Sequence, residues 1–304
     1  AAAACVTGAP GPGAGSRSGV SEEAIVANKV DFTGVQWKSV EWTNLCLLYL
    51  RAHESKLARP ILGDHVAAQD IERIDYDFPR MHRALHPDTN QFMVALRSAQ
   101  FDAMIDVYLD RHPEALVLHL GCGLHSRGLR MARPDGGPWY DVDLPNVIAL
   151  RRQLHSETER YRMVGSSVTD PRWVEELPVG GPVLIVAEGL LMYLTLDEVA
   201  ALLHRLLDRF DSGELIADYL SPWGPRMSKI FTAGLIKWGT RDGAEVIRAE
   251  PRLKPVDSSP IMAGHERIPL SRQRLLYRLQ YALPAVREYD RIYRYTFDNS
   301  PTTR

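Results

Sequence analysis

Two glycines and an acidic residue stand at a spacing that could hold a nucleotide-like ligand. The apolar run 117–120 leads directly into Gly121 and Gly123, and Asp143 follows at the end of a second apolar segment. Glycines after a buried strand let the backbone approach a ligand, and an acid about 20 residues farther on can accept hydrogen bonds from both ribose hydroxyls. This spacing predicts a site for a ligand that contains a ribose.

Asp143 has competing interpretations. It directly precedes an expected helix over 144–154 and could serve only as the N-cap of that helix. Asp141 lies two residues earlier, points to the same side of the strand and is a rival ribose ligand. We favour Asp143 because it stands at the end of a strand, where ligands bind in open parallel sheets.

A third chemical group follows another apolar run. Glu188 and Gly189 come directly after the segment 182–187. A carboxylate at the end of an apolar strand needs a partner or must face a cleft. Because the carboxyl ends of parallel strands share one edge of a sheet, we expect Glu188 to meet Gly121 and Asp143 there.

The motifs that are missing narrow the choice of ligand. A dinucleotide fingerprint needs a third glycine where this chain has Ser126, and no GxxxxGK phosphate loop is present. S-adenosylmethionine contains a ribose but no phosphate, so it needs neither motif. Its carboxylate requires a cation, for which Arg97 on the preceding helix is the candidate. An NAD(P)-dependent oxidoreductase on a similar sheet is the competing prediction.

Strands and helices alternate through the middle of the chain. Helical spacing predicts helices over 144–154 and 195–210 and a short helix over 173–177. Thr195 and Glu198 form a capping box for the helix over 195–210, and Gly213 is its expected left-handed stop. Such alternation is typical of a parallel sheet with helices on both faces. Apolar runs predict its strands over 115–120, 138–142, 161–164, 182–187 and 214–220.

The flanking segments divide the chain into further parts. Helices are expected over 41–58 and 89–111, closed by Pro60 and Pro113, and residues 60–90 are predicted to be irregular. The chain after Ser221 is less regular and ends in strand-like alternation. We therefore predict a flexible tail (1–20), a helical N-terminal cap (21–88), a core (89–304) and, within that core, a segment that covers the acceptor (222–263).

Composition excludes several classes of protein. The chain has 304 residues, 24% of them charged, and a formal net charge of −2, so no general attraction to nucleic acid or to an anionic membrane is expected. No apolar run is long enough to span a bilayer. Three scattered cysteines argue against a disulfide framework and favour the cytoplasm. We predict no metal site, and the sequence indicates no particular oligomeric state.

Several blocks of sequence, in the right order, resemble one known family. The blocks 120–127, 141–145 and 187–194, with Arg97-Ser98 and the segment 51–55 upstream, are similar to those of the leucine carboxyl methyltransferase family. The similarity is greatest to its bacterial branch, which includes polyketide carboxyl O-methyltransferases of the tetracenomycin type. The match extends from about Trp42 to Trp223.

The resemblance implies a fold, a cofactor and a set of cofactor-binding residues. The fold would be a class I methyltransferase, a Rossmann-like α/β protein with a mostly parallel seven-stranded sheet and a helical N-terminal cap. The cofactor would be S-adenosylmethionine, with its carboxylate on Arg97, its ribose on Asp143 and its amino group beside Glu188. Gly121, Gly123 and Gly189 would line its path. Where the family has an Asp-Leu pair at the adenine, this chain has Ser167 and Val168.

The proposed reaction is in-line attack of an acceptor oxygen on the sulfonium methyl group. A carboxylate acceptor is ionised at neutral pH and needs no base, whereas a phenol would benefit from one. His125 is the first candidate base, because it follows the glycine turn where the family usually has an acid, and Tyr193 is a second catalytic candidate. Tyr219 and Trp223 are expected on the acceptor side.

Three further histidines, His53, His82 and His265, are alternative bases. The predicted function is O-methylation of a carboxylate or phenol of a small, polyketide-like natural product. The alternatives are an oxidoreductase and a methyltransferase that acts on a protein C-terminus.

Overall fold

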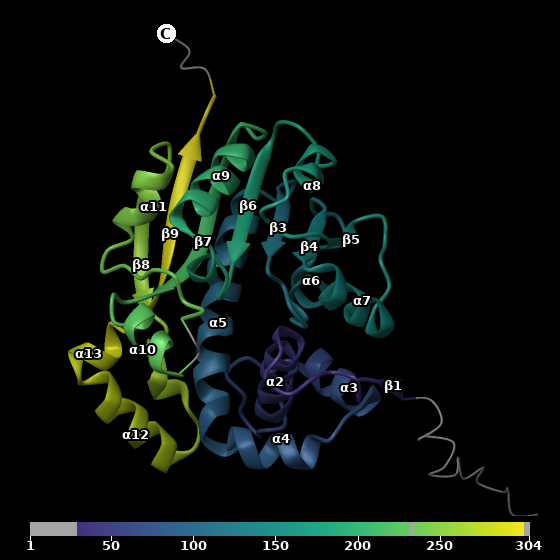
Figure 1. Ribbon diagram of the computed structural model, residues 1–304, viewed down its shortest axis with the longest axis vertical. Coiled ribbons are helices and arrows are strands. Elements are labelled where there is room, and N and C mark those ends of the chain that lie inside the picture. Colours follow the sequence, from purple (N-terminus) through teal and green to yellow (C-terminus); the bar gives the residue numbers. More distant parts are fainter. Residues whose placement is uncertain (1–28, 232–233, 301–304) are drawn as a thin grey trace, which may run out of the picture.

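A seven-stranded sheet forms the centre of the computed structural model, which describes residues 29–231 and 234–300 (Figure 1). Its strand order is β5-β4-β3-β6-β7-β9-β8; neighbours from β5 to β7 are parallel, and β9 is antiparallel to β7 and β8. This confirms the expected class I methyltransferase sheet. The strands are β3 (Leu116–Leu120), β4 (Trp139–Asp143), β5 (Tyr161–Gly165), β6 (Pro182–Ala187), β7 (Ser212–Leu220), β8 (Lys254–Pro260) and β9 (Asp290–Asp298).

The strand order reverses between β3 and β6. From β3 the chain moves outward to β4 and β5, then returns to the other side of β3 with β6 and continues to β7. Ligands bind beside such a reversal, beyond the carboxyl ends of the strands. These ends, which we call the carboxyl edge, point downwards in Figure 1, toward the N-terminal helices. Gly121, Asp143 and Glu188 each end or follow one of these strands, so the topology brings them to this edge.

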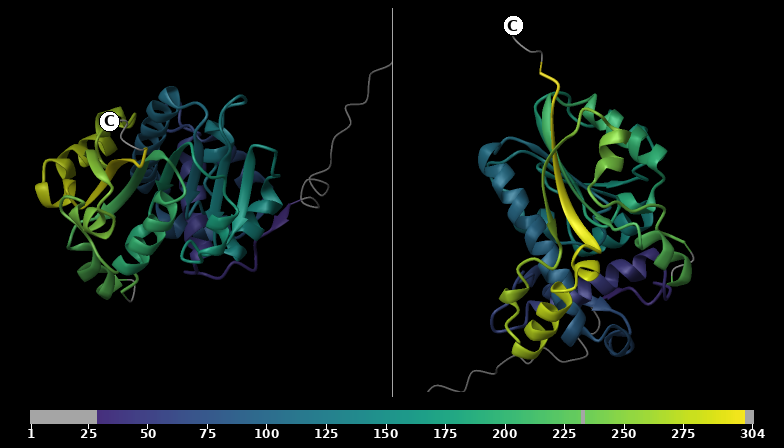
Figure 2. Two further views of the ribbon diagram at one scale, coloured as in Figure 1. Left: turned by 90° about the horizontal axis from the view of Figure 1, so that it is seen from above. Right: turned by 90° about the vertical axis from the view of Figure 1, so that its left-hand side faces the viewer.

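Helices cover both faces of the sheet, as the side view in Figure 2 shows. The core of the first face includes Phe101, Val117 and Ile216, and that of the second includes Leu118 and Leu215. Alternate residues of one strand therefore meet different helices. The first face carries α5 (Pro87–Arg111), α6 (Arg127–Met131) and α7 (Pro145–Leu154), and the second carries α8 (Arg172–Glu175), α9 (Leu196–Leu207) and α11 (Ala244–Ala249).

The N-terminal helices lie below the carboxyl edge in Figure 1. The predicted irregular stretch over 60–90 is wrong, because the Asp64 and Asp77 side chains cap two short helices there. The first helix ends at Glu54, so Pro60 does not terminate it. The elements are β1 (Val30–Asp31), α2 (Val40–Glu54), α3 (His65–Arg73), β2 (Ile74–Asp75) and α4 (Phe78–Leu85), with β1 and β2 paired in parallel.

The segment 222–263 is only partly outside the sheet, which corrects the prediction of a continuous acceptor cover. Its last part forms the edge strand β8, and α11 packs through Val246 on the face that α9 covers. Only α10 (Gly224–Phe231) directly follows the carboxyl end of β7. The chain between β8 and β9 forms η2 (His265–Arg267), α12 (Ser271–Tyr281) and α13 (Pro284–Arg287).

At α7 and at the start of β7 the predicted helix boundaries are also wrong, whereas the predicted start of α9 is confirmed. Leu144, not Asp143, is the N-cap of α7. Gly213 lies inside β7, where a Cβ atom would lie 2.3 Å from the Val183 carbonyl oxygen, so this glycine permits strand packing and does not end a helix. Thr195 and Glu198 form the expected capping box of α9.

Among residues 29–231 and 234–300, no helix combines the length and the apolar character needed to cross a bilayer. The tail predicted at 1–20 lies outside the described residues.

Candidate active site

The glycine turn joins the ends of β3 and β4. Gly121 and Gly123 have φ angles of +61° and +53°, which glycine adopts without strain. The Gly123 N–H donates to Asp143 Oδ2 at 2.7 Å, and the Leu144 N–H donates to Oδ1 at 2.7 Å. The carboxylate therefore orders the turn, while each of its oxygens keeps a lone pair for a ligand hydroxyl.

The same glycines allow close approach of two other segments. A Cβ atom on Gly121 would lie 2.9 Å from Leu190 Cδ1, beyond the end of β6. A Cβ atom on Gly123 would lie 2.7 Å from Asn44 Oδ1 of α2. The glycine turn is thus in contact with both the other half of the sheet and the N-terminal helices.

Asp141 is held inside the fold, so Asp143 is the acid at the carboxyl edge. The Asp141 carboxylate is fully buried and accepts hydrogen bonds from Arg151 and Tyr161, and Oδ1 lies 3.1 Å from His119 Nδ1. Burial alone would raise the pKa of Asp141, but Arg151 and His119 hold it well below its ordinary value. Burial raises the pKa of Asp143, against the two backbone amides that lower it.

Glu188 lies between two arginines. Arg127 Nη2 donates to Glu188 Oε2 at 2.6 Å, and Arg97 Nε lies 3.4 Å from Oε1. Burial would raise the pKa of Glu188, but Arg127 and Arg97 lower it to about 2. Glu188 is therefore ionised at neutral pH, and its side chain is 11% exposed, so a fixed negative charge stands beside the strand reversal.

Arg97 is also paired with Asp218 on β7. Arg97 Nη2 lies 2.7 Å from Asp218 Oδ2, and the Gly189 N–H donates to Asp218 Oδ1 at 2.6 Å. Gly189 has a φ of +64°, and a Cβ atom there would lie 2.6 Å from Arg97 Nη2. Glycine at 189 thus makes room for the guanidinium beside the backbone.

The charges and hydrogen-bonding groups of these residues match those of S-adenosylmethionine. Arg97 is the cation that pairs with both Glu188 and Asp218 in this cluster, and its guanidinium complements a ligand carboxylate. The ionised Glu188 complements an ammonium group, and Asp143 complements a ribose diol. The glycine turn provides the close backbone approach that such a ligand needs.

His125 does not have a free lone pair. Its Nδ1 accepts the Arg127 backbone N–H at 3.1 Å, and its Nε2 lies 3.1 Å from Ser98 Oγ. Burial first, and then the nearby Arg127 and Arg51, hold the pKa of His125 well below its ordinary value. The neutral ring carries its proton on Nε2, so this geometry is unsuited to the general base that was predicted at this position.

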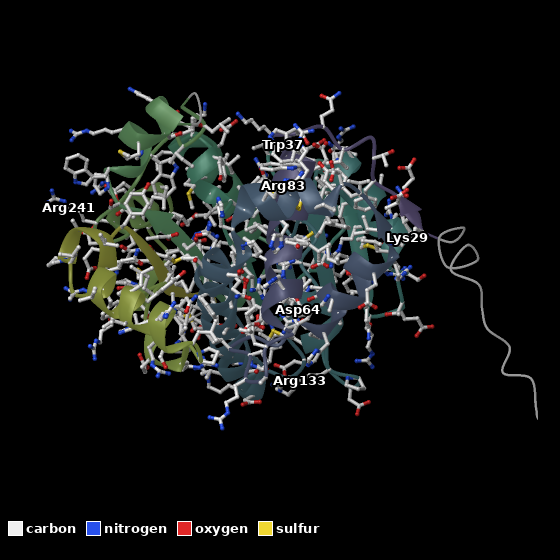
Figure 3. All side chains as sticks on the ribbon, turned by 90° about the horizontal axis from the view of Figure 1, so that it is seen from below. Lys29, Trp37, Asp64, Arg83, Arg133 and Arg241 are labelled. Atoms are coloured by element: carbon white, nitrogen blue, oxygen red, sulfur yellow. The ribbon has the colours of Figure 1, made fainter. Side chains whose placement is uncertain are left out.

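The N-terminal helices hold the chain that follows the glycine turn. Arg51 on α2 donates to Asp64 Oδ2 at 3.1 Å and to the Leu124 carbonyl oxygen at 2.9 Å. Asp64 in turn accepts the Ser126 hydroxyl at 2.6 Å. Seen from below, Asp64 lies near the middle of the molecule, among the N-terminal helices (Figure 3). These buried polar contacts fix the position of the turn relative to the cap.

The remaining cofactor and catalytic candidates lie near strand ends. Ser167 and Val168 follow β5; the Ser167 hydroxyl pairs with Thr169 Oγ1 at 2.8 Å, and the Val168 side chain is buried in the core. Ser167 and the backbone are thus the polar groups that this segment can offer to an adenine. Tyr193 ends the turn η1 (Leu191–Tyr193) and is 44% exposed.

The two acceptor candidates are not brought together. Tyr219 is 1% exposed and packs against Trp238, with ring centroids 5.0 Å apart. It follows Asp218 in β7 and therefore points to the opposite face of the sheet, which contradicts its predicted role in acceptor binding. Trp223 is 60% exposed, with the Arg226 guanidinium 5.5 Å from its ring centroid.

Sequence reasoning missed the importance of Asp218 and Arg127. Asp218 lies near the carboxyl end of β7, so the rule that selected Glu188 would also have selected it. Arg127 is fully buried and reaches Glu188, Asp102 and His119. No sequence signal distinguishes such an arginine from an exposed one at the start of a helix.

Comparison with known proteins places the chain in a family. Residues 47–207 match the family model described as leucine carboxyl methyltransferase. The tetracenomycin polyketide synthesis O-methyltransferase TcmP of Streptomyces glaucescens is 34% identical over 273 residues, which are 86% of this chain and 98% of that protein. The S-adenosyl-L-methionine-dependent methyltransferase dpfgK of Gibberella zeae is 36% identical over 64% of this chain and 68% of its own length.

A solved structure, the geranyl diphosphate C-methyltransferase from Streptomyces coelicolor A3(2), superposes with a TM-score of 0.46 at 15% identity, covering 84% of this chain and 98% of that one.

Proposed function

Because the chain belongs to the leucine carboxyl methyltransferase family, we propose that it methylates an oxygen atom of a small, polyketide-like natural product. The broader activity, methyl transfer that depends on S-adenosylmethionine, follows from the family. The name of the relative TcmP describes an O-methyltransferase of polyketide synthesis, and this supports the choice of oxygen and of acceptor class.

The observation that carries the proposal is the convergence of three groups at the carboxyl edge. Asp143 would hold the ribose, Glu188 the amino group and Arg97 the carboxylate of the cofactor, with Gly121 and Gly123 beneath it. When bound, S-adenosylmethionine supplies a methyl group on a sulfonium, which is already a strong electrophile. The task of the chain is then to orient the acceptor oxygen and exclude water.

A carboxylate is the acceptor oxygen that fits this site best. Both ring nitrogens of His125 are engaged in hydrogen bonds, so this residue does not supply a base for a phenol. A carboxylate is already ionised at neutral pH and needs no base. Tyr193, which is half-exposed beyond the end of β6, is the side chain that we propose to contact the acceptor, with Trp223 as a further candidate.

The direct test is methyl transfer from methyl-labelled S-adenosylmethionine to a matched pair of aromatic polyketides, one with a free carboxyl group and one with only phenols. Label is expected on the acid as an ester, which mild base releases. Stable label on the phenol would favour an aryl ether and revise the acceptor. Transfer to nitrogen or carbon acceptors, with no oxygen labelled, would overturn the proposal.

Two alternatives are separated by simple controls. S-adenosylhomocysteine is expected to raise the melting temperature and NAD is not, because a ligand that binds only the native state stabilises it; the reverse result would favour an oxidoreductase. A peptide with a free C-terminal leucine is expected to remain unlabelled; if it were labelled in preference to the polyketide acid, the acceptor would be a protein terminus.

The cellular setting is a further part of the proposal. Cys46 and Cys122 are buried free thiols, and burial raises the pKa of both. Inert, reduced cysteines suit the reducing cytoplasm, where we place the enzyme.

A further inference from the structure

We infer that His125 is a positioning residue that orients the Glu188 carboxylate through the hydroxyl of Ser98. The inference rests on the proposed function, because it concerns the acid that would hold the cofactor's amino group. The three residues come from the glycine turn, from α5 and from the end of β6. They form one chain of hydrogen bonds in which the direction of every proton is determined.

The direction is set by a backbone amide, which can only donate. The Arg127 N–H lies 3.1 Å from His125 Nδ1, so Nδ1 must be the acceptor. The ring is buried, with 6% of the residue exposed, and it lies among arginines that disfavour a positive charge. The neutral ring therefore carries its proton on Nε2, which faces Ser98 Oγ at 3.1 Å.

Ser98 passes this direction on to Glu188. The Ser98 oxygen accepts a hydrogen bond from the Nε2–H of His125. The Ser98 hydroxyl can therefore donate its own hydrogen bond to Glu188 Oε1, 3.3 Å away. The other carboxylate oxygen accepts Arg127 Nη2 at 2.6 Å. We call this chain of hydrogen bonds, from His125 through Ser98 to Glu188, the relay. Arg127 contacts both of its ends, because its backbone N–H donates to His125 and its side chain donates to Glu188. Ser98 and Arg127 thus hold one oxygen of Glu188 each by a hydrogen bond, and Arg97 Nε lies 3.4 Å from Oε1.

A positioning role and a general-base role for His125 predict different kinetic effects of its replacement. A base accepts a proton from the acceptor during methyl transfer, so its loss lowers kcat. A positioning residue acts on the cofactor site, so its loss raises the KM and the Kd for the cofactor and leaves kcat at saturation little changed. The effect must also depend on Ser98, because the relay passes through that hydroxyl.

The test is a double-mutant cycle with His125→Asn and Ser98→Ala, read as the Kd of S-adenosylhomocysteine by calorimetry. Asparagine can still accept the Arg127 amide but does not reach Ser98. We expect each single variant to raise Kd about 10-fold, as loss of a hydrogen bond to a charged group does, and the double variant to bind no more weakly than either single variant. His125→Gln, whose amide reaches farther, should restore Kd to within about threefold of the wild type.

Other results overturn the inference. Fully additive losses, or an unchanged Kd in His125→Asn, would show that the histidine does not act through Ser98. A drop in kcat with unchanged Kd that persists in the Ser98→Ala background would establish the base instead. Circular dichroism of each variant identifies unfolding; lower melting temperatures with unchanged affinity would also refute the relay. A wild-type protein that does not bind S-adenosylhomocysteine would refute the proposed function itself.

Discussion

The backbone amide of Gly123 donates to Asp143 Oδ2 at 2.7 Å, so the residue expected to hold the ribose also holds the glycine turn. The second oxygen accepts the Leu144 amide, which starts α7. One carboxylate thus links the ends of β3 and β4 with the following helix. The same side chain therefore contributes to the fold and to the site.

Replacing Asp143 with alanine should impair both properties. The buried Gly123 amide would lose its partner, at a cost of about 1–3 kcal/mol in the free energy of unfolding. The Kd for S-adenosylhomocysteine should rise at least about 10-fold, because the ribose hydroxyls lose their acceptor. Calorimetry and urea denaturation measure the two effects. Asp88→Asn, at a side chain that is 78% exposed, is the matched control and should change neither; unchanged affinity in Asp143→Ala would remove this residue from the site.

Gly189→Ala should weaken cofactor binding through Arg97. The new Cβ atom would lie 2.6 Å from Arg97 Nη2 at a φ of +64°, so the guanidinium must move. Gly181→Ala is the control, because its φ is +72° and nothing lies within 4 Å of its Cβ position. Both variants should lose about 1–2 kcal/mol of stability from backbone strain, but only Gly189→Ala should raise the Kd, by about 10-fold or more. Equal affinities in the two variants would contradict the placement of Arg97.

The two buried histidines should show opposite tautomers. His119 Nε2 faces the Arg127 guanidinium at 3.2 Å and its Nδ1 faces Asp141 at 3.1 Å, so its proton belongs on Nδ1. His125 has its proton on Nε2. Nitrogen-15 NMR of histidine-labelled protein at pH 6.5 distinguishes these forms, and the His125→Asn variant assigns the signals. A protonated, doubly donating His125 at that pH would be incompatible with the relay.

Acid should destabilise the protein partly through Glu188. Its pKa is about 2 in the fold, below the ordinary value, so its stabilising contribution is complete above about pH 4.5 and is lost as the pH falls toward 2. The full contribution corresponds to about 3 kcal/mol of unfolding free energy. The free energy of unfolding, measured from denaturation curves between pH 7 and pH 3, should therefore fall less for Glu188→Gln than for the wild type. Glu266→Gln, at a 72% exposed side chain, should retain the wild-type slope; a wild-type slope in Glu188→Gln would mean that its carboxylate is not held as described.

The sheet and its carboxyl edge were predictable because their signals are local. Apolar runs such as Val183 to Val186 mark strands that are buried on both faces. A glycine or a charged residue stands where such a run ends, so the sequence also indicates the end of the strand. The register of Asp218 and Tyr219 would have shown that Tyr219 points away from the edge.

Other features depend on partners that are distant in the sequence. The short helices α3 and α4 begin at capping aspartates within a polar stretch, where periodicity is weak. Gly213 follows a helix, as helix-ending glycines do, but the Val183 carbonyl decides its role. His125 accepts the Arg127 amide at Nδ1 and faces Ser98 Oγ with its Nε2–H, and that pairing exists only in the folded chain.

One adenosyl ligand should contact three strand ends at the carboxyl edge. The most direct measurement is the electron density of a crystal grown with S-adenosylhomocysteine. We predict the ribose hydroxyls within hydrogen-bonding distance of Asp143 and the amino group within hydrogen-bonding distance of Glu188. Density for the ligand at any other place, or at the edge without both contacts, would contradict the account.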